Sequence, residues 1–157
     1  MPEESFYPTA VSFYFKVSVG NSTNRTDAAF RDVSGLVAEM DTETYLEGGE
    51  NTMAYRLPKG VKYQNLVLSR GVASSTSPLV NWCIETLQGG LGERIRTREL
   101  IISLLGPGKT ESEACPLHSW TVVNAYPVKW QAESFNAEKS EVAIEKIEFA
   151  FTHFYRV

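Results

Sequence analysis

The chain is poor in the residues that build most catalytic and metal sites. Its 157 residues include 2 cysteines and 2 histidines. Cys83 and Cys115 lie far apart without the spacing of metal ligands, so we expect two reduced thiols. Neither His118 nor His153 has another ligand at a suitable spacing, which predicts no metal and no cofactor. A Cys115–His118 pair has the residue types of a nucleophile and its base, but no third group orients them, and we expect no enzyme.

The chain also lacks long runs of one kind of side chain. Its 15 Lys and Arg are scattered among 19 Asp and Glu, giving a net charge of −4, which argues against specific nucleic-acid binding. No apolar stretch approaches the length that crosses a bilayer. Residues 1–4, Met-Pro-Glu-Glu, are acidic where a secretory signal would be basic. We therefore expect no membrane span and synthesis in the cytosol.

Neither a Pro/Ser linker nor an internal repeat divides the sequence, which predicts a single domain over residues 1–157. Most of it has the alternating apolar pattern of half-buried strands. Ser77-Pro78 predicts the N-cap and first turn of one helix to about Gln88, with Leu79, Cys83 and Leu87 on one face and Trp82 beside it. Strands are expected over 9–18, 28–33, 36–46, 52–58, 66–70, 97–105, 118–126, 128–131 and 142–156, with a β-bulge near Glu145 in the last one.

One helix against about eight strands predicts a mainly β fold in which large side chains fill the core. We expect seven aromatic residues there: Phe13, Phe15, Trp82, Trp120, Trp130, Phe149 and Phe151. A barrel that binds a small apolar ligand would use the same residues around a cavity, so this alternative stays open.

Gly106-Pro107-Gly108-Lys109-Thr110 is similar to the end of a phosphate-binding loop. The first glycine of that motif would fall at Ser103, inside a predicted strand, and acidic residues and proline follow where a helix should begin. We interpret 106–116 as a surface connection.

Residues 33–71 form the most informative stretch, a predicted long β-hairpin too polar for the core of a monomer. Its turn is Glu47-Gly48-Gly49-Glu50-Asn51, because glycines supply the positive φ angles of a tight reversal. Three carboxylates precede the turn at alternate positions, so a strand places Glu39, Asp41 and Glu43 on one face. This row is either a solvated face or a functional acidic lining.

The sequence as a whole resembles the phage tail tube family, in particular the inner tube proteins of contractile phage tails and of phage-tail-like contractile injection systems. The motifs that carry the resemblance run in order along the chain: Phe13-Tyr14-Phe15-Lys16-Val17, Val33-Ser34-Gly35-Leu36, Tyr45-x-Glu47-Gly48-Gly49-x-Asn51, Leu57-Pro58, Asn65-Leu66-x-Leu68-x-Arg70-Gly71, Trp120 through Trp130, and Glu141-Val142-Ala143-Ile144-Glu145. The long connection over 106–116, with Cys115, departs from the leaner family form.

The resemblance implies a β-sandwich or barrel-like tail tube fold with one flanking helix and a long hairpin. It implies hexameric rings of this chain that stack into a tube, with sheath, baseplate, spike and terminator proteins as partners and with effector proteins or DNA as transient cargo. The product would be a virion tail or an injection particle. On this basis Glu39, Asp41 and Glu43 are candidates for the lumen wall, and the candidate subunit or ring contacts are Tyr45, Glu47, Gly48, Gly49 and Asn51.

Two alternatives remain beside this interpretation. A type VI secretion tube protein shares the fold, and a monomeric β-barrel for a small apolar ligand belongs to a different class. The second predicts a large apolar cavity in a protein that does not assemble.

Overall fold

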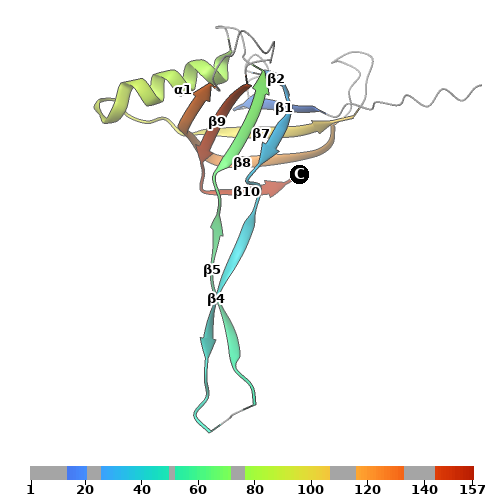
Figure 1. Cartoon of the computed structure of the whole chain (residues 1–157), viewed down its shortest axis with the longest axis vertical. Coiled ribbons are helices and arrows are strands. Elements are labelled where there is room, and N and C mark those ends of the chain that lie inside the picture. Colours follow the sequence, from blue (N-terminus) through green and yellow to red (C-terminus); the bar gives the residue numbers. More distant parts are fainter. Residues whose placement is uncertain (1–13, 21–25, 50–51, 72–76, 107–115, 133–143) are drawn as a thin grey trace, which may run out of the picture.

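The computed structural model describes residues 14–20, 26–49, 52–71, 77–106, 116–132 and 144–157. Figure 1 shows a rounded body, which contains the helix and most of the strands, and a long two-stranded arm that extends away from it. The fold is therefore mainly β, with a flanking helix and a long hairpin, as the sequence predicts.

A single antiparallel sheet forms the body, and it curls until its two ends meet. The strand order is β2-β1-β7-β8-β9-β6-β3, and β10 pairs with β8. The end strands β2 and β3 are consecutive in the chain, and between them the N–H of Arg31 donates to the carbonyl of Ser69 on β6, at 2.9 Å. This contact brings the two ends of the open sheet together and gives the body a barrel-like shape. The strands are β1 (Tyr14–Val19), β2 (Thr26–Phe30), β3 (Asp32–Ser34), β6 (Leu66–Gly71), β7 (Arg98–Leu105), β8 (Pro116–Ala132), β9 (Ile144–Ala150) and β10 (His153–Arg156).

The long strand β8 joins the two halves of the sheet. Its first part pairs with β7 and its second part with β9. The prediction of two strands, separated at Pro127, is wrong: pairing with β7 ends at Ala125, so the missing N–H of proline costs no hydrogen bond on that edge. The predicted strand over 142–156 is instead two strands, β9 and β10, which follow each other along β8 and are interrupted at Phe151 and Thr152.

The apolar phase of β9 does not slip, and the predicted bulge at Glu145 is wrong. The strand pairs with β6 in an unbroken register, and Glu145, Ile147 and Phe149 all face the interior. Glu145 takes an apolar position because Arg70 lies directly opposite it on β6, with Nε 3.3 Å from Oε2. A buried carboxylate is tolerated when it is paired in this way. The bulge lies instead on β8, between Pro127 and Lys129.

Helix α1 (Pro78–Gly89) covers one side of the barrel core, and its capping matches the prediction. Ser77 is the N-cap and its Oγ accepts a hydrogen bond from the N–H of Val80 at 3.3 Å. Trp82 packs on Phe149 with 5.5 Å between ring centroids. The predicted apolar face is corrected at Leu87, which is exposed; the buried side chains are Leu79, Val80, Trp82 and Cys83.

The core is filled by side chains from both halves of the sheet and from α1, including Phe30, Leu68, Ile102 and Phe149, each 0% exposed. The predicted core aromatics Phe15, Trp120 and Phe151 pack against this cluster while half-buried. Trp130 is 42% exposed, so its assignment to the core is wrong. Phe13 lies outside the described residues.

Candidate functional site

The arm is a hairpin of two strands, β4 (Ala38–Tyr45) and β5 (Tyr55–Tyr63). The returning strand is longer than the predicted 52–58, because it continues through Pro58 and Gly60, two residues that usually break strands. A β-bulge explains how: the register shifts between Asp41 and Thr42, opposite Lys59, so the irregularity falls where proline and glycine are tolerated. The hairpin and the joined strands β3 and β6 have the same register, which makes 32–71 one long antiparallel unit rooted in the sheet.

The root of the arm depends on a close backbone approach at Gly35. This residue has φ +91°, and a Cβ at its position would lie 1.9 Å from the carbonyl oxygen of Asn65. Only glycine fits both conditions. Beside this junction the ring of Tyr63, the last residue of β5, packs on Phe151 and Phe154 at 5.7 and 5.6 Å between centroids. The arm therefore leaves the body in a defined direction.

The predicted acidic row lies on one face of β4, because the extra residue of the bulge is on β5 and leaves the alternation of β4 intact. Glu39 and Glu43 are exposed and Asp41 is half-buried. Asp41 Oδ1 forms an ion pair with Lys62 Nζ at 2.8 Å. The hydrogen bond that Lys62 donates to Asp41, the charge of Asp41 and then the charge of Glu39 raise the pKa of Lys62 above its usual 10.5. The sequence alone does not place this neutralising lysine beside the acidic row.

The opposite face of the hairpin has little charge. Met40 and Val61 form a cross-strand pair on it and are 56% and 48% exposed, although both are apolar. Farther along the same face, Arg56 Nη2 donates to Thr42 Oγ1 at 3.2 Å. This face of the hairpin is therefore less charged and more apolar than the acidic face.

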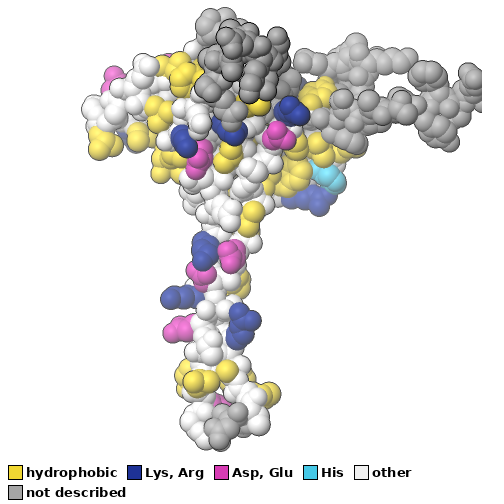
Figure 2. Space-filling model, viewed as in Figure 1, with side chains coloured by type: hydrophobic (Ala, Val, Ile, Leu, Met, Phe, Trp, Pro, Cys, Tyr) yellow, Lys and Arg dark blue, Asp and Glu magenta, His cyan; other side chains and the backbone are white. Residues whose placement is uncertain are grey.

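Exposed apolar side chains are also concentrated near the tip of the arm. Figure 2 shows acidic and basic side chains along the middle of the arm and hydrophobic ones close to its end. The hydrophobic ones are Tyr45, Leu46, Met53, Tyr55 and Leu57, which we call the tip cluster. Of the predicted contact residues, Tyr45, Glu47, Gly48 and Gly49 are exposed there, and Gly49 has φ +100°, as a tight turn requires. Asn51 lies outside the described residues.

The described residues contain no group of three His, Cys, Asp or Glu that could hold a metal ion. His118 accepts a hydrogen bond at Nδ1 from Arg156 Nη2, at 2.6 Å, in an exposed position. Cys115 and most of the connection over 106–116 lie outside the described residues. Among the helices described, none is long and apolar enough to cross a membrane.

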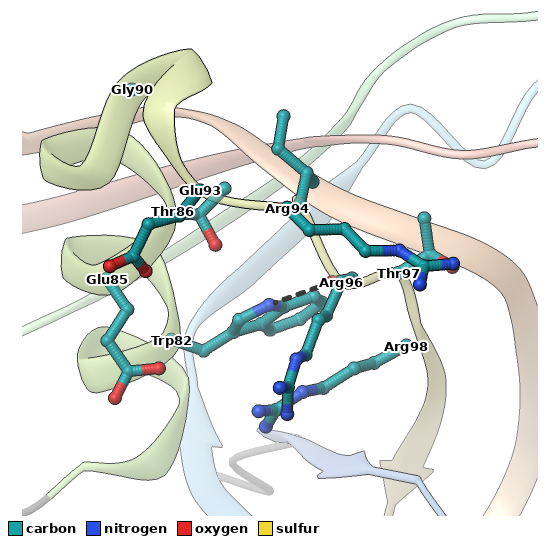
Figure 3. A pocket seen from close by; sticks show the side chains of 10 residues that line it. Trp82, Glu85, Thr86, Gly90, Glu93, Arg94, Arg96, Thr97 and Arg98 are labelled. Carbon is teal, nitrogen blue, oxygen red and sulfur yellow. Dashed lines mark hydrogen bonds between the residues drawn. The ribbon is translucent and has the colours of Figure 1, made fainter.

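A surface groove of about 920 Å³ lies beside α1, where the sequence analysis predicted no site (Figure 3). It is lined by charged and polar side chains, including Arg94, Arg96 and Arg98, and not by the apolar surface that a small hydrophobic ligand needs. It therefore does not favour the ligand-binding alternative. In the sequence, this groove is marked only by Arg94, Arg96 and Arg98 at alternate positions, which do not form a continuous basic run.

A known protein family and several solved structures are similar to this chain. Residues 11–155 match the family described as T4-like virus tail tube protein gp19. One similar solved structure is a chain of the anti-feeding prophage baseplate, with 26% identity and a TM-score of 0.71; the match covers 98% of this chain and 97% of that chain. Another is a chain of the sheath–tube complex of an extracellular contractile injection system, PVC, in the extended state, with 25% identity, a TM-score of 0.72 and coverage of 98% and 93%.

More distant structures have the same fold. Hcp1 from Flavobacterium johnsoniae is 11% identical with a TM-score of 0.54, and the match covers 91% of this chain and 94% of that one. The comparison with curated proteins gives no match. The resemblance predicted from the sequence motifs is confirmed by the family match over nearly the whole length, and the chain belongs to the family of T4-like virus tail tube proteins.

Proposed function

We propose that this tail tube protein is the repeating subunit of the inner tube of a contractile injection system or contractile phage tail. Copies form hexameric rings, and the rings stack into a hollow tube. The observation that carries the proposal is the hairpin, which is solvent-exposed along both strands and is joined to the sheet of the body. The chain that bears it belongs to a family of tail tube proteins. The role is structural, without catalysis and without a cofactor. Synthesis takes place in the bacterial cytoplasm, and the chain acts as a single domain.

The hairpin supports assembly because it is incomplete by itself. Within the described residues, β4 and β5 form a separate two-stranded sheet, so each strand has one unpaired edge. A two-stranded hairpin is marginally stable in water, and free edges pair with other chains. Pairing with the hairpins of neighbouring subunits in a ring would satisfy both edges and produce a continuous barrel wall.

The two faces of the hairpin support an orientation of that wall. Burying Glu39, Asp41 and Glu43 against a neighbour would remove charged groups from water at high cost, whereas burying Met40 and Val61 removes apolar surface and is favourable. The acidic face therefore lines the water-filled lumen and the apolar face packs outward. Negative charge on the lumen wall would repel DNA phosphates and acidic effector proteins, and this repulsion prevents adhesion during transit.

Partners outside the tube are proposed from the structures that this chain is similar to. Those structures are an anti-feeding prophage baseplate and a tube-terminating cap, and PVC assemblies with a sheath and with a sheath/tube terminator. We therefore expect sheath, baseplate with spike, and terminator proteins around this tube. The proposed contacts made by the turn itself are those of Tyr45, Glu47, Gly48, Gly49 and Asn51 with an adjacent subunit or ring.

Shortening the hairpin tests the proposal. Replacement of residues 45–55 by a two-residue Asn-Gly turn keeps the body and the root of the arm intact. We expect soluble monomers or isolated rings of this variant in sedimentation velocity and negative-stain microscopy, beside long tubes of the unaltered chain. Long tubes formed by the shortened variant would show that the tip has no part in assembly.

A further inference from the structure

The groove beside α1 has a rigid floor. The indole of Trp82 is 2% exposed, and its Nε1–H donates to the carbonyl of Arg96 at 3.3 Å. The guanidinium of Arg98 lies over the same ring, 5.1 Å from its centroid. In Figure 3 the side chains of Arg96 and Arg98 extend in the same direction past the indole, whereas Arg94 points away from it. These contacts fix the connection between α1 and β7 against the body.

The rim of this groove is both basic and apolar. Residues 90–98 contain three arginines and one acidic residue, Glu93. Glu85 of α1 also lines the groove, so the lining keeps an excess of positive charge. Leu91 is 96% exposed and Ile95 40% exposed. A leucine this exposed beside arginines fits a surface that binds an apolar and acidic partner.

The tip of the hairpin has the complementary character. The tip cluster contributes two tyrosines and three other apolar side chains, and Glu47 lies among them. Residues 43–57 contain three glutamates and one arginine. Tyrosine rings bind arginine guanidinium groups through their faces, and tyrosine and arginine are enriched at the centres of protein interfaces.

The two surfaces lie at opposite ends of the molecule. In Figure 1 the tip is at the far end of the arm, while α1 and the connection that follows it are on the body. A contact that repeats head to tail needs two different and complementary surfaces so placed, and it does not close on itself. A second copy of this chain, positioned one step along an axis, satisfies that requirement.

We infer that the groove lined by Trp82, Arg94, Arg96 and Arg98 is the receiving site for the hairpin tip of a second copy of this chain in the next ring. The inference rests on the proposed function and adds the partner surface. The tip cluster lies over Leu91 and Ile95, and Glu47 faces Arg94 and Arg96. Arg98 positions the floor through Trp82 and is not required to touch the incoming tip.

Charge reversal with rescue tests this docking. We expect the variant Arg94→Glu/Arg96→Glu to form rings whose mean stack length, in negative-stain images, is at least about tenfold shorter, because like charges then face each other across the contact. Glu47→Arg should show the same defect, and the three substitutions combined should restore long stacks. Arg31→Glu/Lys129→Glu, at two exposed positions outside the groove, is the control with the same change of charge.

Leu91→Ser provides a second test, because a side chain this exposed contributes little to the fold of the subunit. Its stacks should be shorter while the melting temperature of the subunit is unchanged. Stacks of normal length in Arg94→Glu/Arg96→Glu, or failure of the combined variant to restore them, would overturn the docking site and leave the proposed tube function intact. An unaltered chain that never forms rings or tubes would instead overturn the proposed function itself.

Discussion

Arg70 on β6 and Glu145 on β9 form an ion pair inside the barrel, 5% and 3% exposed, with Nε 3.3 Å from Oε2. The same arginine donates from Nη2 to Ser77 Oγ at 2.7 Å, and Trp130 Nε1 donates to the other carboxylate oxygen at 2.6 Å. The pair thus ties two strands to the N-cap of α1.

Removing one partner of this pair should be costly. We expect Arg70→Met to lower the free energy of unfolding by about 3–5 kcal/mol, because Glu145 remains buried without its counter-charge. Arg70→Met/Glu145→Leu should cost less than the sum of the single changes, in urea unfolding of the unassembled subunit. Arg56→Met, at an exposed arginine, is the control and should change stability by less than about 0.5 kcal/mol. Equal small effects for both arginines would contradict a structural role of the pair.

Gly35 should tolerate no side chain. In Gly35→Ala the new Cβ would meet the backbone oxygen of Asn65, and the left-handed φ adds about 1–3 kcal/mol of strain. We expect a lower melting temperature and fewer tubes, because the arm changes direction at its root. Gly60→Ala is the matched control: no atom lies within 4 Å of its added Cβ. Similar behaviour of the two variants would argue against the junction at Gly35.

The pKa of Lys62 reports the ion pair on the acidic face. Because this pKa is raised in the folded hairpin, the pair stabilises the hairpin at pH values below 10.5, and its contribution is lost as the pH rises through the raised value. Asp41→Asn should return the pKa of Lys62 toward 10.5, measured by NMR titration of its side chain. Glu39→Gln should lower it less, since only the charge of Glu39 acts on the lysine. An unchanged titration in Asp41→Asn would show that the ion pair does not form in solution.

Reversal of the acidic row tests its proposed place on the lumen wall. We expect Glu39→Lys/Asp41→Lys/Glu43→Lys to slow or block delivery of cargo, because a basic wall attracts DNA or acidic proteins, while tube length stays normal. The measurements are a delivery assay and tube lengths from micrographs. Thr42→Lys/Thr44→Lys, on the opposite face of β4, is the matched comparison and should impair assembly instead. Normal delivery by the triple variant would place the acidic face outside the lumen.

Much of the fold could be predicted because the alternation of apolar and polar residues is visible within each short stretch of sequence. Alternation located most strands, and Ser77-Pro78 located the start of α1. The errors have physical causes in contacts made across the sheet. The charged Glu145 stands at an apolar position, so the alternation of β9 seemed to slip there. The residue that makes this position possible, Arg70, is 75 residues away in sequence. Pro58 and Pro127 looked like strand ends because a bulge or a missing neighbour strand, which makes proline tolerable, is invisible in the sequence.

The candidate surfaces were predictable to a similar degree. The common face of Glu39, Asp41 and Glu43 follows from strand geometry alone. Lys62 could not be assigned to that face without the register of the hairpin, which the bulge at Lys59 shifts by one residue. The groove was missed because Trp82 and the arginines come from different elements that only the tertiary fold brings together.

Cryo-electron microscopy of the purified chain under conditions that favour assembly tests its role as an inner tube subunit most directly. We predict stacked hexameric rings in which the hairpins pair edge to edge around an open lumen lined by Glu39, Asp41 and Glu43. Persistent monomers at high protein concentration, with the hairpin free in solution, would contradict it.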